Sequence, residues 1–71
     1  MEERELAAAL QATLEELDPA HRAAFLLRHQ EGLSPAEIAE VLSISVANAK
    51  VRVHRAREAV LQAMRRRGHG V

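Results

Sequence analysis

Apolar residues in the first part of the chain recur with a helical period. Leu6, Leu10, Leu14 and Leu17 follow one another at spacings of four, four and three residues. This spacing places them on one stripe of a helix that covers about residues 2–17. Three glutamates near the start of the segment suit the positive end of the helix dipole.

A second helix is predicted from about Pro19 to Glu31. Asp18 can cap its free N–H groups, and proline at a first helical position costs no hydrogen bond. Gly32 is suited to a left-handed residue that ends the helix. Its broad apolar side consists of Ala23, Phe25, Leu26 and Leu27.

The next segment has the pattern of two helices joined by a tight turn. Ser34, Pro35 and Glu37 form a capping box that opens a helix over about residues 35–42. Its inward residues are predicted to be Ile38, Ala39 and Leu42. Ser43 and Ile44 form the turn, and Ser45 caps a fourth helix that runs to about Arg66. The predicted buried side of that helix is Val46, Ala49, Val53, Ala56, Val60 and Met64.

These elements predict an all-α fold, a small four-helix domain with a C-terminal helix-turn-helix over about residues 34–57. The whole chain, residues 1–71, is expected to form this single domain. Glycines at 68 and 70 mark residues 66–71 as a frayed tail.

The amino-acid composition argues against several kinds of site and partner. The chain has no cysteine, so it has neither a disulfide nor a thiolate metal site. Phe25 is the only aromatic residue, which disfavours binding of single strands or RNA by base stacking. No apolar run is long enough to cross a membrane, and the acidic N-terminus is unlike a signal peptide. A cytoplasmic protein is therefore expected.

The net charge of zero hides a strong asymmetry along the chain. Residues 1–44 hold nine acidic and three basic residues, a net charge of −6, whereas residues 45–71 hold seven basic residues and one acidic residue, a net charge of +6. A surface that attracts an anion can therefore exist beside one that repels it.

The fourth helix has the residue types of a DNA reader. If its apolar residues face the core, the residues left facing outward are Asn48, Lys50, Val51, Arg52, His54 and Arg55. Lys and Arg can donate to guanine, Asn can pair with adenine, and Val can contact a thymine methyl. Basic residues on an exposed helix are often only solvated. Here the preceding capped helix and the short turn favour a helix-turn-helix that binds DNA.

The sequence gives little support for metal binding or catalysis. His21, His29, His54 and His69 lack the spacing of a metal site, and we expect no metal or cofactor. No arrangement of nucleophile, base or paired carboxylates suggests an enzyme with a small-molecule substrate.

The ordered motifs resemble region 4 of bacterial sigma factors, of the extracytoplasmic-function class. The motifs that carry this similarity are LDP at 17–19, RAAFLLR at 22–28, EGLS at 31–34, EIAEVL at 37–42, ISV at 44–46 and KVRVHRAR at 50–57. The resemblance implies recognition of the −35 element in double-stranded promoter DNA and docking on the β flap of RNA polymerase. An anti-sigma protein is a further candidate partner.

The resemblance also implies roles for particular residues. Lys50, Val51, His54 and Arg55 match base-reading positions, and Arg52 and Arg57 match positions on the phosphate side. Asn48 stands near the start of the reading helix and completes the expected DNA-binding set. The polymerase-facing candidates are Leu14, Leu17, Phe25 and Leu26.

The chain departs from the family pattern at several places. Ser43 stands where glycine is common in the turn, Ala47 and Asn48 stand where Gly-Thr is frequent, and Ala49 replaces a larger aliphatic residue. Region 2 is absent, so the chain is expected to be a domain cut from a sigma factor or a stand-alone relative. Two alternatives remain open, a DNA-binding domain of a dimeric LuxR-type regulator and a module that binds polymerase or an anti-sigma protein without DNA.

Overall fold

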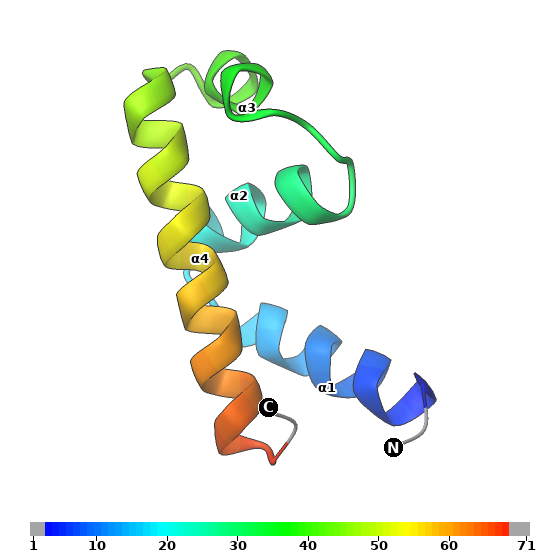
Figure 1. Cartoon of the computed structure of the whole chain (residues 1–71). Helices are drawn as coiled ribbons and strands as arrows, with labels where there is room; N and C mark the ends of the chain where they lie inside the picture. The colour runs from blue at the N-terminus through cyan, green and yellow to red at the C-terminus, as the bar shows by residue number, and fades with distance from the viewer. Residues whose placement is uncertain (1–2, 69–71) are drawn as a thin grey trace.

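The computed structural model describes residues 3–68, and this part of the chain forms four α-helices and no strand. The helices are α1 (Glu3–Glu16), α2 (Pro19–His29), α3 (Pro35–Leu42) and α4 (Val46–Arg66). The long α4 runs the length of the molecule, with α3 near its start, α2 beside its middle and α1 near its end (Figure 1). The predicted all-α fold is confirmed.

Local capping fixes where α2 and α3 begin. The Asp18 carboxylate accepts a hydrogen bond of 2.7 Å from the Ala20 N–H, and Pro19 takes the first helical position. At α3 the Ser34 hydroxyl accepts from the Glu37 N–H at 3.1 Å, and the Glu37 carboxylate accepts from the Ser34 N–H at 2.9 Å. Hydrogen bonding of the Glu37 carboxylate, first to the Ser34 backbone N–H and then to the Ser34 side chain, lowers the pKa of Glu37 because it favours the charged form. Both predicted starts are confirmed.

The end of α2 differs slightly from the prediction. The helix was expected to reach Glu31 but ends at His29. Gly32 has a φ of 71°, the predicted left-handed conformation, and it turns the chain so that the Leu33 N–H donates to the Leu27 carbonyl oxygen at 3.0 Å. The helix therefore ends two residues earlier than periodicity indicated, while the chain reverses at Gly32 as predicted.

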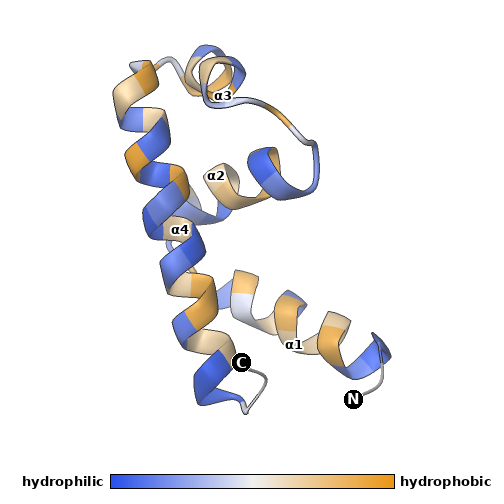
Figure 2. Cartoon of the chain, viewed as in Figure 1, coloured by the Kyte–Doolittle hydropathy of each residue, from blue (hydrophilic) through white to orange (hydrophobic). Residues whose placement is uncertain are grey.

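Two apolar clusters share α4 as their common wall, and hydrophobic positions recur turn by turn along this helix (Figure 2). The α3–α4 cluster has Ile38, Ala39 and Ala49 at its centre, with Leu27, Leu33, Leu42, Ile44 and Val53 around them. The α1–α4 cluster has Leu14, Val60 and Met64 at its centre, with Ala9, Leu10, Leu17, Phe25 and Leu26 around them. One helix thus connects the helix-turn-helix with the rest of the fold.

Two residues predicted to be apolar contacts are in fact exposed. Val46 is 44% exposed because it is the first residue of α4 and the α3–α4 cluster begins one turn later, at Ala49. Leu6 is 43% exposed because the α1–α4 cluster reaches along α1 only as far as Ala9. The predicted burial of Val46 is therefore wrong.

Polar contacts attach the end of α1 to the end of α4. The buried Thr13 hydroxyl donates to the Ala9 carbonyl oxygen at 2.8 Å and lies 3.5 Å from the Met64 Sδ. Glu16 forms an ion pair with Arg67, which directly follows α4. Of the tail predicted at residues 66–71, residue 66 is the last of α4 and residues 69–71 lie outside the described part.

Within residues 3–68, no helix has both the length and the apolar character needed to cross a membrane.

Candidate nucleic-acid interface and apolar groove

A short left-handed turn holds α4 against α3. Ser43 has φ 57° and ψ 47°, and its N–H donates to the Glu40 carbonyl oxygen at 3.3 Å. The next N–H, of Ile44, donates to the Ala39 carbonyl oxygen at 3.0 Å. The Ser45 hydroxyl then accepts from the N–H of residue 48 at 3.0 Å and caps α4. These bonds fix the direction in which α4 leaves the turn.

The outward face of α4 carries most of the predicted DNA-binding residues. Those with exposed side chains are Asn48, Lys50, Val51, His54, Arg55 and Arg57, whereas Arg52 is half-buried. Val51 is 47% exposed and therefore presents an apolar side chain to an incoming ligand. The face combines amide, cationic and apolar groups, the types that contact base edges and thymine methyls.

The start of α2 lies beside one flank of this face. A hollow of about 310 Å³ is lined there by Asn48, Val51, Arg52 and Arg55 of α4 and by Asp18, Ala20 and His21. His21 is thus a neighbour of the predicted reading residues. His21 could not be assigned to this site from the sequence, because only tertiary packing brings α2 and α4 together.

The other flank is a more strongly cationic hollow of about 250 Å³. It is lined by Lys50, Val53, His54 and Arg57 of α4, by Arg28 and His29 of α2, and by Pro35. No acidic residue belongs to this lining. We call it the basic hollow. Lysine and arginine donors placed in this way suit a phosphate group.

Arg28 and His29 were missed as site residues. Arg28 Nη1 donates to the Leu33 carbonyl oxygen at 3.3 Å, which holds this side chain against the loop before α3. The pKa of His29 is lowered, first by partial burial and then by the nearby charges of Arg28 and Arg57. No local pattern in the sequence marks them as site residues, because their place beside α4 depends on the packing of α2.

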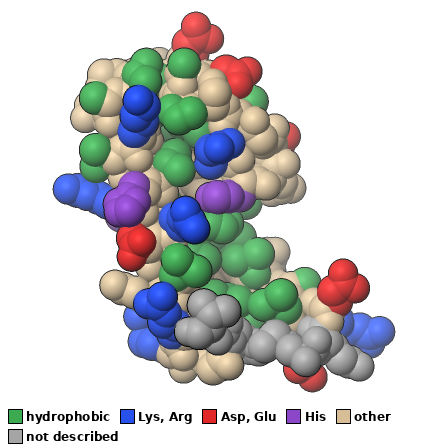
Figure 3. Space-filling model, viewed as in Figure 1, with side chains coloured by type: hydrophobic (Ala, Val, Ile, Leu, Met, Phe, Trp, Pro, Cys, Tyr) green, Lys and Arg blue, Asp and Glu red, His purple; other side chains and the backbone are tan. Residues whose placement is uncertain are grey.

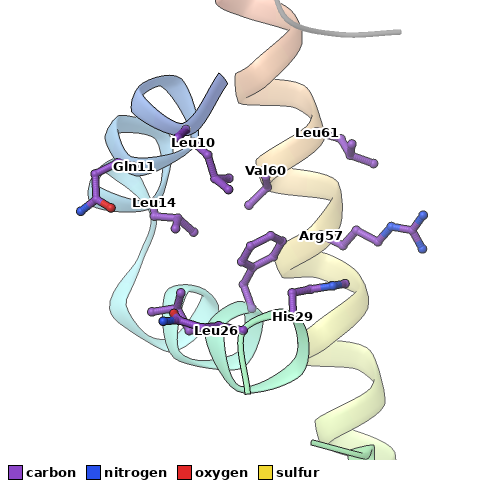
Figure 4. Close-up of a pocket in the computed structure, with 11 residues that line it drawn as sticks. Leu10, Gln11, Leu14, Leu26, His29, Arg57, Val60 and Leu61 are labelled. Atoms are coloured by element: carbon purple, nitrogen blue, oxygen red, sulfur yellow. The ribbon is translucent and has the colours of Figure 1, made fainter. Parts of the chain in front are cut away.

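A larger apolar groove of about 530 Å³ lies among α1, α2 and α4 (Figure 4). Its apolar lining consists of Ala7, Leu10, Leu14, Phe25, Leu26, Val60 and Leu61. The polar residues at its edges are Gln11, His29, Gln30 and Arg57. The rings of Phe25 and His29 lie with centroids 4.6 Å apart. In the space-filling view, hydrophobic side chains gather between α1 and α2, directly beside a group of Lys, Arg and His side chains (Figure 3).

The groove contains most of the residues predicted to face a protein partner. Leu14, Phe25 and Leu26 line it, and Leu14 is largely buried as part of its floor. Leu17 packs on the same cluster but is not part of the groove lining. Leu61, a candidate dimer contact under the LuxR-type alternative, also lines the groove.

Among residues 3–68, no three His, Asp or Glu side chains cluster in a way that could hold a metal ion.

Comparison of the sequence with known proteins identifies a family that matches it. A family model described as sigma-70, region 4, matches residues 7–60. Over 61 residues the chain is 36% identical to the ECF RNA polymerase sigma factor SigW of Bacillus subtilis (strain 168). This match covers 86% of the chain but 33% of the relative, so the chain spans about a third of the relative's length.

Proposed function

This chain belongs to the sigma-70 region 4 family, and we propose that its α4 recognises the −35 element of promoter DNA from the major groove. The observation that carries the proposal is the exposed face of α4, with its cationic, amide and apolar side chains. Capping at Ser45 and the left-handed turn at Ser43 hold this face in a fixed direction. A recognition helix needs such a fixed direction, because base contacts depend on its register in the groove.

We assign base reading to the centre of the α4 face and phosphate binding to its flanks. The proposed base-reading residues are Asn48, Lys50, Val51, His54 and Arg55. Arg52 and Arg57 are proposed to contact phosphates, and the basic hollow adds Arg28 on the side of Arg57. This division follows the usual arrangement, in which phosphate contacts position a domain and base contacts specify the sequence.

Selection from a randomised duplex pool tests the proposal. At moderate salt, the retained fraction should be enriched in a short, non-palindromic motif that contains guanines. Arg55→Ala should abolish this preference, because a bidentate arginine contact discriminates by about 1–3 kcal/mol. Arg65→Ala should instead weaken binding to all duplexes alike. Residue 65 lies in the last turn of α4, far from the reading half, so its charge can attract phosphates but cannot contact base edges.

Other outcomes would point elsewhere. An equal loss of preference in both variants would contradict the assignment of Arg55 to base reading. A palindromic motif would favour the dimeric LuxR-type alternative. Binding only at low salt, without enrichment, would favour a module that docks on proteins.

We further propose that the apolar groove is the surface that docks on the β flap of RNA polymerase or on an anti-sigma protein. A groove of about 530 Å³ falls within the usual size range of binding clefts, and its apolar lining supports a role as a binding surface. Leu14, Phe25 and Leu26 supply the predicted contacts, and Leu10, Val60 and Leu61 extend them. Leu17 remains a proposed contact outside the groove lining.

A further inference from the structure

Two residues belong to both candidate surfaces. His29 and Arg57 line the apolar groove and also line the basic hollow beside the proposed DNA face. His29 comes from the last turn of α2 and Arg57 from the middle of α4. Figure 4 shows the His29 side chain lying between the two helices and the Arg57 side chain extending outward from α4. These two residues therefore form the wall between the surfaces.

The shared wall is cationic and has no acidic partner in either lining. The groove is otherwise lined by apolar residues and two glutamines, and the basic hollow adds Arg28, Lys50 and His54 on its other side. Partial burial lowers the pKa of His29, and the charges of Arg28 and Arg57 lower it further, so Arg57 is the main cation of the shared wall. Arg57 is exposed, so its long side chain is able to turn toward either surface. An anion on either side would compete for the same guanidinium.

We propose that the groove binds an amphipathic partner helix with carboxylates in its last turn, and that this helix competes with DNA for Arg57. The helical form suits a groove bounded by α1, α2 and α4, because another helix can pack its apolar stripe on them. Carboxylates complement the Arg57 guanidinium, and the negative end of a helix dipole also favours a nearby cation. This inference rests on the proposed DNA-binding and docking functions and adds a coupling between them.

An acidic partner helix in the groove is expected to weaken DNA binding, whereas a neutral helix is expected to leave DNA affinity unchanged. A carboxylate that pairs with Arg57 withdraws this cation from a DNA phosphate and adds negative charge beside the basic hollow. Because coupling between two binding sites is reciprocal, DNA must weaken the partner helix by the same factor. An apolar helix without carboxylates would fill the groove and leave Arg57 available to DNA.

Two matched synthetic peptides test the coupling with the 71-residue chain. Both are amphipathic helices with leucines every three to four positions, and they carry either two glutamates or two glutamines in the last turn. Anisotropy of a labelled duplex gives the Kd for DNA first without peptide and then in the presence of saturating peptide. The glutamate peptide should raise the Kd roughly three- to fivefold, the range expected for one exposed charge contact. The glutamine peptide should leave it unchanged.

Variants separate this effect from general electrostatic repulsion. In Arg57→Gln the two peptides should have the same small effect on DNA binding. In Arg65→Gln, which removes an equal charge at the far end of α4, the glutamate peptide should still weaken DNA binding. Equal weakening in wild-type and Arg57→Gln would show that the repulsion does not act through Arg57, and the proposal would be wrong.

The controls also distinguish failure of the coupling from failure of the functions beneath it. Peptide binding is followed by chemical shifts of Leu10, Leu26 and Leu61. One outcome is that the duplex binds and the glutamate peptide shifts these signals, but the DNA Kd stays constant. The coupling is then refuted, while DNA binding and helix docking both stand. If neither peptide shifts these signals, the groove does not take a helix and the inference is also refuted. If no duplex binds before peptide is added, the proposed DNA function itself has failed.

Discussion

Ser43 holds a backbone conformation that is unfavourable for a residue with a side chain. Its φ of 57° and ψ of 47° lie in the left-handed region, where only glycine avoids a steric cost of roughly 1 kcal/mol. The side chain is exposed, so the fold gains little from keeping it. We predict that Ser43→Gly raises the free energy of unfolding by about 0.5–1 kcal/mol, less than the full strain because glycine is also freer when unfolded. Thermal unfolding should show a Tm higher by about 2–8 °C.

Ser45→Gly is the matched control, two residues further along. Ser45 has an extended backbone with φ −72° and caps α4 through its hydroxyl. Glycine there relieves no strain and loses the cap, so the Tm should fall slightly. If Ser43→Gly lowered the Tm as well, the Ser43 side chain would have to stabilise the turn.

The roles of residues that hydrogen-bond to their neighbours in sequence could be predicted without a structure. Asp18, Ser34 and Ser45 were predicted as caps because each bonds to an N–H two or three residues away. His21 and Arg28 could not be assigned in this way. Their place beside the α4 face depends on the packing of α2 against α4, which no local pattern specifies.

At the scale of elements, α1 is attached to the fold mainly through α4. Helix α2 packs on both α3 and α4, whereas α1 packs closely on α4. Its attachment uses Leu14, the Thr13–Met64 contact and the Glu16–Arg67 ion pair. We therefore expect α1 to open locally more often than the helix-turn-helix does.

Hydrogen exchange with Arg67→Gln tests this view of α1. The variant removes the ion pair with Glu16, and an exposed pair of this kind contributes about 0.2–1 kcal/mol. Amide exchange in α1 should therefore become up to about fivefold faster, while exchange in α3 should not change. Arg65→Gln removes the same charge without removing this pair and should leave α1 unaffected. Equal acceleration in α1 and α3 would mean that the four helices open as one unit.

The sequence predicts where each helix begins and ends better than it predicts which of its residues a neighbouring helix covers. The limits of α3 and α4 follow from capping signals, and these predictions are confirmed. The exposure of Leu6 and Val46 was not predicted, because periodicity identifies a stripe but not how far a neighbouring helix covers it. The groove depends on the same missing information, since it forms where α1 and α2 leave part of their apolar sides uncovered.

At the scale of the whole molecule, charge is divided between the two parts of the chain. The first 44 residues carry a net charge of −6 and the remaining 27 carry +6. The fold brings parts of the two halves together, because α1 lies beside the end of α4 and Glu16 pairs with Arg67 (Figure 1). Helix α2 likewise brings Arg28 of the first half into the basic hollow. DNA should therefore respond to the local charge of the α4 face and not to the net charge of zero.

The salt dependence of DNA binding distinguishes local from net charge. Each phosphate that the protein neutralises makes log K fall with log[salt] by a slope of about 0.9. Arg57→Gln and Arg4→Gln change the net charge equally, but residue 57 is a proposed phosphate contact exposed on α4, whereas residue 4 lies in the first turn of α1. We predict that Arg57→Gln reduces the slope by about 0.9, because one phosphate contact is lost. Arg4→Gln should leave the slope unchanged, as measured by anisotropy across a salt series. Equal reductions would mean that the duplex responds to the charge of the whole molecule, and the α4 face would no longer account for binding.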